Sequence, residues 1–300
     1  MNCQLVLIHG RAQEHKNAAD LKQEWLTTFE RGLANAGLSL PISHSEIHFP
    51  YYGQTLFDLV DGASEEAAAQ VVVRGRTSAD TARREFIASV VEEVRQVSNI
   101  DDASIDAVLA RGVKEKGVLQ WEWVQAALAA IDLHVPSASA ASIALATNDV
   151  YQYLRNPGIS GVIDSGVRKA IQANVPTVVV AHSLGTVVAY NLLRRDGEEL
   201  KWKIPLFVTL GSPLAVTAIH QSLRPIRFPS CVTHWFNASD PLDIVALHPL
   251  DQERFAVEPA IENMLDVKNA TTNHHGISGY LDNPNVARRI YDALKAASNT

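Results

Sequence analysis

Cysteine is scarce in this sequence, because only Cys3 and Cys231 occur among its 300 residues. The two fall in separate predicted strands, whereas scaffolds that depend on disulfides carry many more cysteines in far shorter chains. Both are therefore predicted to be buried free thiols, which excludes a disulfide framework. A reducing compartment, the cytoplasm, is the location that this usage favours.

Long apolar runs are also missing. No stretch approaches the roughly 18 consecutive apolar residues that a membrane span needs, so no integral membrane segment is expected. The first residues, MNCQLVLIHG, have no basic start and no long apolar core, so no secretion signal is expected either.

Positive charge is not in excess, since 26 basic residues against 33 acidic ones give a formal net charge of -7. The basic residues are scattered along the chain instead of forming a stripe. This pattern argues against nucleic acid or an anionic membrane surface as the main partner.

Short β-rich runs are present, and helical periodicity fills the segments between them. The runs cover residues 4–8, 46–49, 177–181, 206–210 and 231–236. Strands that alternate with helices predict a mostly parallel sheet with helices on both faces, and continuous apolar runs such as TVVVA are typical of strands covered on both sides. The fold class is therefore α/β.

The spacing of these runs is uneven, because residues 50–176 separate two strands that a single crossover helix could join. Most of this interval has helical patterns, among them residues 80–99, VLQWEWVQAALAAI and DVYQYLRN. We therefore expect one domain over residues 1–300 with a helical insertion at 55–172.

In the segment TVVVAHSLGTVVAY a strand pattern gives way to a helix pattern with hardly any loop between them. A serine at such a junction, Ser183, is pushed out above the sheet edge on a strained backbone that small neighbours permit. Ala181 and Gly185 are those neighbours. The alternative is that Ser183 is an ordinary helix N-cap.

The string Ala-His-Ser-Leu-Gly resembles the nucleophile elbow of the α/β-hydrolase superfamily, and in particular that of its lipase- and esterase-like members. The resemblance covers residues 1–60 and 175–300 but not the middle of the chain. It implies an α/β-hydrolase fold in which the acid and then the base follow the serine along the chain.

Candidates for the acid and the base occur in that order, as a pair of each. Asp240 and Asp243 lie in a loop after the last predicted strand, and His274 and His275 lie in a polar loop before the final helix. The resemblance favours Asp243, which precedes an apolar pair, and His275, which begins the string H-x-I-x-G-Y-L. Asp240 and His274 remain the alternatives.

Attack on a carbonyl also needs donors that stabilise the developing oxyanion. One donor is expected to be the backbone N–H of Leu184, directly after the serine. The resemblance implies that the other is the N–H of Arg11, with Gly10 letting the loop after the first strand come close to the substrate. The alternative is that His9 and Gly10 merely end this strand.

Several other residues of interest are given structural roles. The insertion is a candidate cap that would bring Trp121, Trp123, Tyr151 and Tyr153 near a cleft or into its own core, and core packing is the favoured role. His182 is expected to support the elbow without acting as the base. Ser212 is expected to lie in a structural turn.

Together these features predict a serine hydrolase that cleaves carboxylic esters, small or lipid-like, through an acyl-enzyme on Ser183. Acyltransferase, thioesterase and amidase activities use the same residues, and a non-catalytic hydrolase-like binding protein is a separate alternative. No cofactor is implied. The adjacent pair His274 and His275 lacks the neighbouring ligands that a metal site requires, so no metal is expected.

Overall fold

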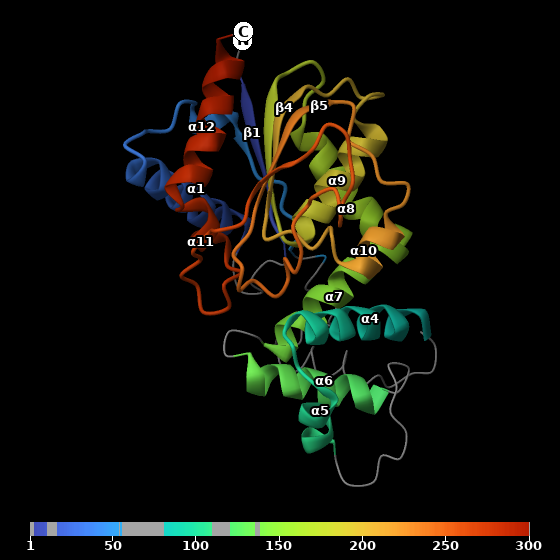
Figure 1. Cartoon of the computed structure of the whole chain (residues 1–300). Coiled ribbons are helices and arrows are strands. Elements are labelled where there is room, and N and C mark those ends of the chain that lie inside the picture. The colour runs from blue at the N-terminus through green and yellow to red at the C-terminus, as the bar shows by residue number, and fades with distance from the viewer. Residues whose placement is uncertain are drawn as a thin grey trace.

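The computed structural model of the chain describes residues 3–10, 17–53, 55, 81–109, 121–135 and 139–299, apart from the side chain of Trp121. A six-stranded parallel sheet lies at its centre (Figure 1). The strands are β1 (Gln4–Ile8), β2 (Ile47–His48), β3 (Thr177–His182), β4 (Ile204–Leu210), β5 (Val232–Ala238) and β6 (Glu262–Met264). Their order across the sheet is β2-β1-β3-β4-β5-β6, and every neighbouring pair is parallel.

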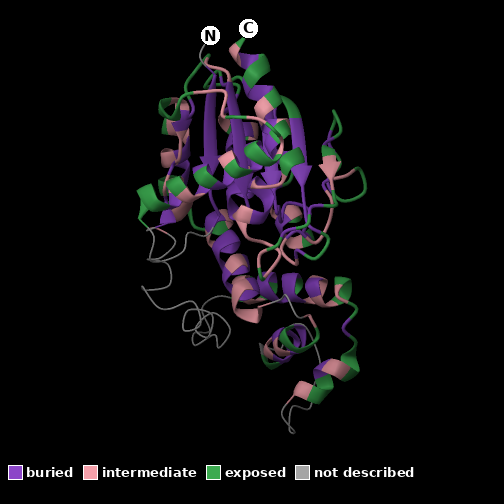
Figure 2. Cartoon of the chain, turned by 90° about the vertical axis from the view of Figure 1, so that its left-hand side faces the viewer, coloured by how far each residue is buried: buried purple, intermediate pink, exposed green. Residues whose placement is uncertain are grey.

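The strands at the centre of the sheet are almost wholly buried, as Figure 2 shows. Val179 of β3 lies between Val6 of β1 and Phe207 of β4, so apolar side chains stack across the sheet. The first five strands match the predicted runs, and the α/β fold class is confirmed. β6 was not predicted, because Glu262–Met264 is short and has no apolar run.

Helices cover both faces of this sheet, because alternate residues of each strand point to opposite sides. The helices are α1 (Ala18–Asn35), α4 (Thr81–Val97), α5 (Asp102–Val108), α6 (Trp121–His134), α7 (Ala140–Arg155), α8 (Pro157–Ala170), α9 (Leu184–Asp196), α10 (Thr217–Ser222), α11 (Ile277–Leu281) and α12 (Pro284–Ser298). One face packs against α1 and α12, and the other packs against α9, on which α7 and α8 pack in turn (Figure 1).

Among the described residues between β2 and β3 are five helices, α4 to α8, where the helical insertion was predicted. In Figure 1, α7 extends from the layer beside the sheet towards α4, α5 and α6, which gather at the lower end of the molecule. Within the described ranges, none of the helices combines the length and the apolar character that crossing a membrane requires.

Both cysteines are free thiols, as predicted. Cys3 is buried before β1, and Cys231 is half-buried before β5. Burial raises the pKa of each thiol to about 11, so both remain protonated at neutral pH.

A close contact joins α1 to α11, the short helix that follows His275. A Cβ atom added to Gly32 of α1 would lie 2.1 Å from the carbonyl oxygen of Leu281. Glycine is therefore required where the two helices meet, and this contact fixes the position of α11 against the sheet.

We predict that Gly32→Ala lowers the free energy of unfolding by about 1–3 kcal/mol, because the new methyl group overlaps backbone that cannot move freely. Gly161→Ala on α8 is the matched control, since its Cβ atom would meet nothing within 4 Å. It is expected to raise stability by up to about 1 kcal/mol through better helix propensity. Urea denaturation measures the free energy of unfolding of both variants. A Gly32→Ala variant as stable as Gly161→Ala would contradict the requirement for glycine at this contact.

Candidate active site

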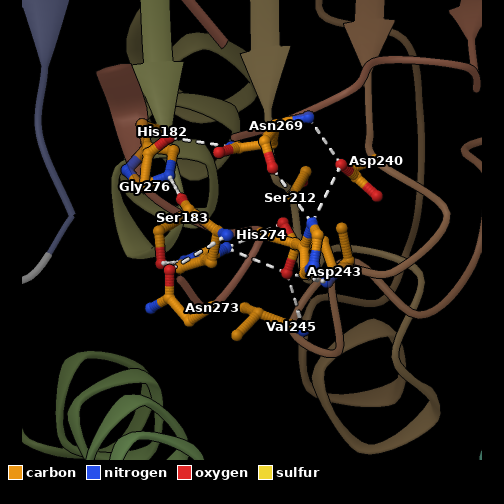
Figure 3. A network of polar contacts seen from close by, with 12 residues as sticks. His182, Ser183, Ser212, Asp240, Asp243, Val245, Asn269, Asn273, His274 and Gly276 are labelled. Carbon is orange, nitrogen blue, oxygen red and sulfur yellow. Dashed lines mark hydrogen bonds and ion pairs between the residues drawn. The ribbon is translucent and has the colours of Figure 1, made fainter. Parts of the chain in front are cut away.

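Ser183 lies at the turn between β3 and α9, with φ 54° and ψ -128°. A non-glycine residue with positive φ is strained, typically by about 1–3 kcal/mol. Ser183 is the N-cap residue of α9, but its side chain makes no capping hydrogen bond to this helix, so it is not the ordinary N-cap of the alternative. The turn points the hydroxyl into the polar network drawn in Figure 3.

Two glycines let the end of β1 pack directly against this turn. A Cβ atom on Gly185 would lie 2.3 Å from the carbonyl oxygen of Ile8, and one on Gly10 would lie 2.7 Å from Cβ of Ser183. No larger residue fits at either position without moving backbone. The prediction that small residues surround the serine is confirmed. Gly185 has no room for a side chain, and the small side chain of Ala181 is fully buried.

A continuous chain of hydrogen bonds runs from Ser183 through His275 to Asp243. The Ser183 hydroxyl lies 2.9 Å from Nε2 of His275, and Nδ1 of the same ring lies 2.8 Å from Oδ2 of Asp243. A neutral imidazole with its proton on Nδ1 satisfies both contacts, because it donates to the carboxylate and accepts from the hydroxyl. The hydroxyl proton is thus aimed at a base.

The Asp243 carboxylate is buried and receives donors from three further directions. Its Oδ1 accepts from the backbone N–H groups of Val245 and Ala246, at 2.9 and 3.3 Å, and its Oδ2 accepts from the Tyr280 hydroxyl at 2.6 Å. Burial alone would raise the pKa of Asp243, but the neighbouring His275 and these donors outweigh it and hold the pKa below its ordinary value. Asp243 is therefore a fixed anion at neutral pH.

The alternatives Asp240 and His274 lie in the same network but serve the loop backbone. Asp240 accepts from the N–H groups of Leu242 and Asn269 at 2.7 and 2.6 Å, and His274 Nδ1 donates to the carbonyl of Asn269 at 3.0 Å. Within the described part of the chain, neither side chain hydrogen-bonds to Ser183. The structure thus connects His275 and Asp243 to Ser183 by hydrogen bonds, whereas Asp240 and His274 bond to the backbone of the loop.

His182 supports the loop that carries the proposed base. Its Nε2–H donates to the carbonyl oxygen of His275 at 2.7 Å, so it holds the loop of His275, whereas the sequence predicted that it supports the elbow around Ser183. Burial and the neighbouring His275 lower the pKa of His182 to about 3, so this ring is neutral and keeps one proton for the contact.

The sequence analysis did not identify Tyr280, which contacts both aspartates. Its hydroxyl donates to Asp243 and accepts from the backbone N–H of Asp240 at 3.1 Å. Burial, together with the nearby Asp243, raises the pKa of Tyr280, so the hydroxyl remains a donor. Its place in the string H-x-I-x-G-Y-L was the one available signal, because it puts Tyr280 on the short helix α11 that directly follows His275.

The predicted oxyanion donors are described only in part. Leu184 is the first residue of α9, so its N–H belongs to the positive end of the helix dipole beside Ser183. Gly10 lies against Ser183, where a glycine lets backbone come close. Arg11, the predicted second donor, lies outside the described residues.

His9 anchors the end of β1 to residues 50–53, the segment PYYG that follows β2. Its Nδ1–H donates to the carbonyl of Gly10 at 2.6 Å, and its Nε2 accepts from the N–H of Tyr52 at 3.2 Å. The Tyr52 hydroxyl donates to the carbonyl of His9. Burial lowers the pKa of His9 to about 4, so the ring is neutral. One ring nitrogen can therefore donate a hydrogen bond while the other accepts one. The segment before Gly10 is therefore held rigidly.

An apolar cavity of about 30 Å³ opens beside Ser183. Its walls come from α4, α7, α10 and the loops after β4 and β5: Val90, Val94, Ile143, Ala146, Thr147, Val150, Pro213, Val216, Ile219, Ile244, Val245 and Leu247. Glu93 fixes the α4 wall, because its carboxylate accepts from the Thr217 N–H at 2.9 Å and contacts His248 Nε2 at 2.7 Å.

The aromatic residues singled out in the insertion belong to its core. Trp123, Tyr151 and Tyr153 are buried in the apolar cluster on the α9 side of the sheet, and Tyr153 also donates to Asp164 at 2.9 Å. The favoured role of core packing is confirmed for these three. The side chain of Trp121 lies outside the described part.

Ser212 lies in a turn, as predicted, where its hydroxyl contacts that of Thr186 at 2.8 Å and accepts from the N–H of Leu214. Among the residues that the structure describes, no three histidine, cysteine, aspartate or glutamate side chains gather as a metal site would require.

Comparisons of the chain with models of known protein families, with curated proteins and with solved structures found no match. Inference about its function therefore depends on the geometry of the chain itself.

We predict that Tyr280→Phe lowers the free energy of unfolding at pH 7 by about 1–3 kcal/mol, because Asp243 loses a donor to its buried charge. A carboxylate with a depressed pKa contributes stability above its unfolded pKa of about 3.9, and this contribution is lost as pH falls through the folded value. The difference between wild type and variant should therefore shrink below about pH 4.

Urea denaturation at pH 7, 5 and 3.5 measures this difference. Tyr291→Phe on α12 is the control, since its hydroxyl does not contact Asp243, and its effect is expected to be small at every pH. A Tyr280→Phe deficit at pH 7 no larger than that of Tyr291→Phe would show that the hydroxyl does not stabilise the carboxylate.

Proposed function

We propose that the protein is a serine hydrolase that cleaves carboxylic esters through an acyl-enzyme on Ser183. The observation that carries this proposal is the continuous hydrogen-bonded chain from Ser183 to His275 to Asp243. A serine hydroxyl is a weak nucleophile until a base accepts its proton, and the base needs an acid to fix its tautomer and stabilise its charged form. In this arrangement Ser183 supplies the nucleophile, His275 the base and Asp243 the acid.

In the proposed first step, His275 Nε2 takes the Ser183 proton while Oγ bonds to the ester carbonyl carbon. The N–H of Leu184, at the start of α9, supports the oxyanion that forms. The carbon–oxygen bond to the alcohol then breaks, and His275 returns the proton to the departing oxygen. Water repeats the sequence on the acyl-enzyme and releases the acid, while Asp243 remains a carboxylate throughout.

The order of the elements supports an α/β-hydrolase fold for this sheet. Ser183 follows β3, Asp243 follows β5 and His275 follows β6, so the three groups meet at the carboxyl ends of parallel strands. Open α/β sheets bind ligands at that edge. We also propose that the segment 55–172 acts as a cap, because α4 and α7 line the cavity at Ser183.

The strained backbone of Ser183 favours an enzyme over a binding protein. Strain of about 1–3 kcal/mol persists where the surrounding structure imposes it, and such positions cluster at reactive sites. A binding protein would not require the hydroxyl, the imidazole and the carboxylate to be in line. Acyltransferase, thioesterase and amidase reactions would use the same residues and differ in the acceptor or the leaving group.

Labelling with a fluorophosphonate tests the proposal directly. The folded protein is expected to be modified at Ser183, and labelling should be lost in Ser183→Ala. With p-nitrophenyl butyrate, His275→Ala is expected to lower kcat by about 10⁴-fold or more, since the base of such a triad is lost. A folded wild-type protein that is neither labelled nor active would refute the proposal.

A matched pair of variants tests the choice of the acid. Asp243→Asn should lower kcat by about 10⁴-fold, because it takes the negative charge from His275 and favours the wrong tautomer. Asp240→Asn removes an equally buried carboxylate that does not contact His275, and it should keep kcat within about tenfold. Circular dichroism controls for folding, and the reverse ranking would assign the acid to Asp240.

A further inference from the structure

The cavity beside Ser183 is lined by two groups of side chains, a buried group that we call its inner end and a half-buried group that we call its mouth. The inner walls are buried side chains: Val90, Val94, Ile143, Val150, Val216 and Ile219. At the other end Ile244, Val245 and Leu247, which follow Asp243 in the chain, are half-buried and reach solvent. A group that enters the inner end is therefore surrounded by α4, α7 and α10.

No charged side chain lines this cavity among the residues that the structure describes. Apart from the Ser183 hydroxyl, the polar group in its wall is that of Thr147 on α7. Burying a charged or strongly polar substrate group here would leave it without partners, which is costly, whereas an aliphatic group gains from leaving water. The chemistry of the walls thus selects a saturated hydrocarbon group.

The volume limits the length of that group. The centre of a water-sized sphere can move through only about 30 Å³ of this cavity, so the space is larger than a single water molecule but small for a ligand site. The inner end therefore fits a short aliphatic chain better than a long one.

We propose that the inner end binds the acyl side of the ester and that the protein prefers short aliphatic acyl groups, from acetyl to butyryl. This inference rests on the serine-hydrolase function proposed above. The new bond joins Ser183 Oγ to the acyl carbon, and the bond to the alcohol oxygen breaks with proton transfer from His275. The acyl group stays attached while the alcohol must depart, so the buried walls suit the acyl group and the half-buried walls suit the alcohol.

Val90 is the specificity-determining residue that best tests this assignment. It faces the cavity from α4, whereas its neighbour Val91 is also buried but lies away from the cavity walls. Val90→Ala removes two methyl groups from the wall and lengthens the space available. Val91→Ala removes the same atoms from the same helix elsewhere, so it controls for general loosening of α4.

The experiment compares two ester series by kcat/KM. The acyl series varies from acetyl to octanoyl with p-nitrophenol as the alcohol, and the alcohol series varies from methyl to octyl with butyryl as the acyl group. Wild type should prefer butyryl to octanoyl by at least about tenfold, since one methylene that does not fit changes the rate about 10–200-fold. Its rates in the alcohol series should vary by less than about threefold.

Val90→Ala should raise the ratio of hexanoyl to butyryl rates by about tenfold and leave the alcohol series unchanged, while Val91→Ala should change neither. Ile143→Val, on the α7 wall, removes a single methyl group and should act in the same direction, so it replaces Val90→Ala if that variant does not fold. A flat acyl series in wild type, or a shift confined to the alcohol series, would overturn the inference.

Fluorophosphonate labelling separates this outcome from failure of the proposed function. If Ser183 is labelled and esters are cleaved with no preference in the acyl series, the cavity assignment is wrong and the hydrolase function stands. If the folded protein is neither labelled nor active on any ester, the hydrolase function is wrong and the cavity assignment falls with it.

Discussion

The buried carboxylate of Asp243 is the interaction on which the candidate site depends. It binds His275 and Tyr280 from the segment around α11, and its own loop after β5 supplies two backbone N–H donors. A buried charge is tolerated only when it is well paired, so these contacts must all form together. The carboxylate thus fixes where the C-terminal segment docks and which imidazole reaches Ser183.

A second constraint acts at Ser183, whose backbone conformation is unfavourable taken alone. It persists because β3 is buried between β1 and β4 and because the end of β1 packs against the turn through Gly10 and Gly185. Favourable burial of the central strands offsets the local cost. The proposed nucleophile is therefore rigid, which is what a group that must meet both a base and a carbonyl requires.

Much of this arrangement could be predicted from the sequence, because a buried strand running straight into a helix leaves Ser183 few possible conformations. The choice between Asp240 and Asp243 could not be made from the residues alone, since both lie in one loop and differ in how the turn aims them. Tyr280 gave no pattern of its own, because its role follows from how α11 packs against α1. β6 was too short and polar to show as a strand.

The walls of the cavity come from two stretches of the chain. Val90 and Ile143 precede β3, whereas Val245 follows it and lies two residues after Asp243. On the proposed function, a substitution in α4 or α7 could alter which molecule is accepted without touching the groups that react, whereas one beside Val245 would also disturb the loop of Asp243. Selection could therefore retune this protein for a new substrate most freely through the two helices.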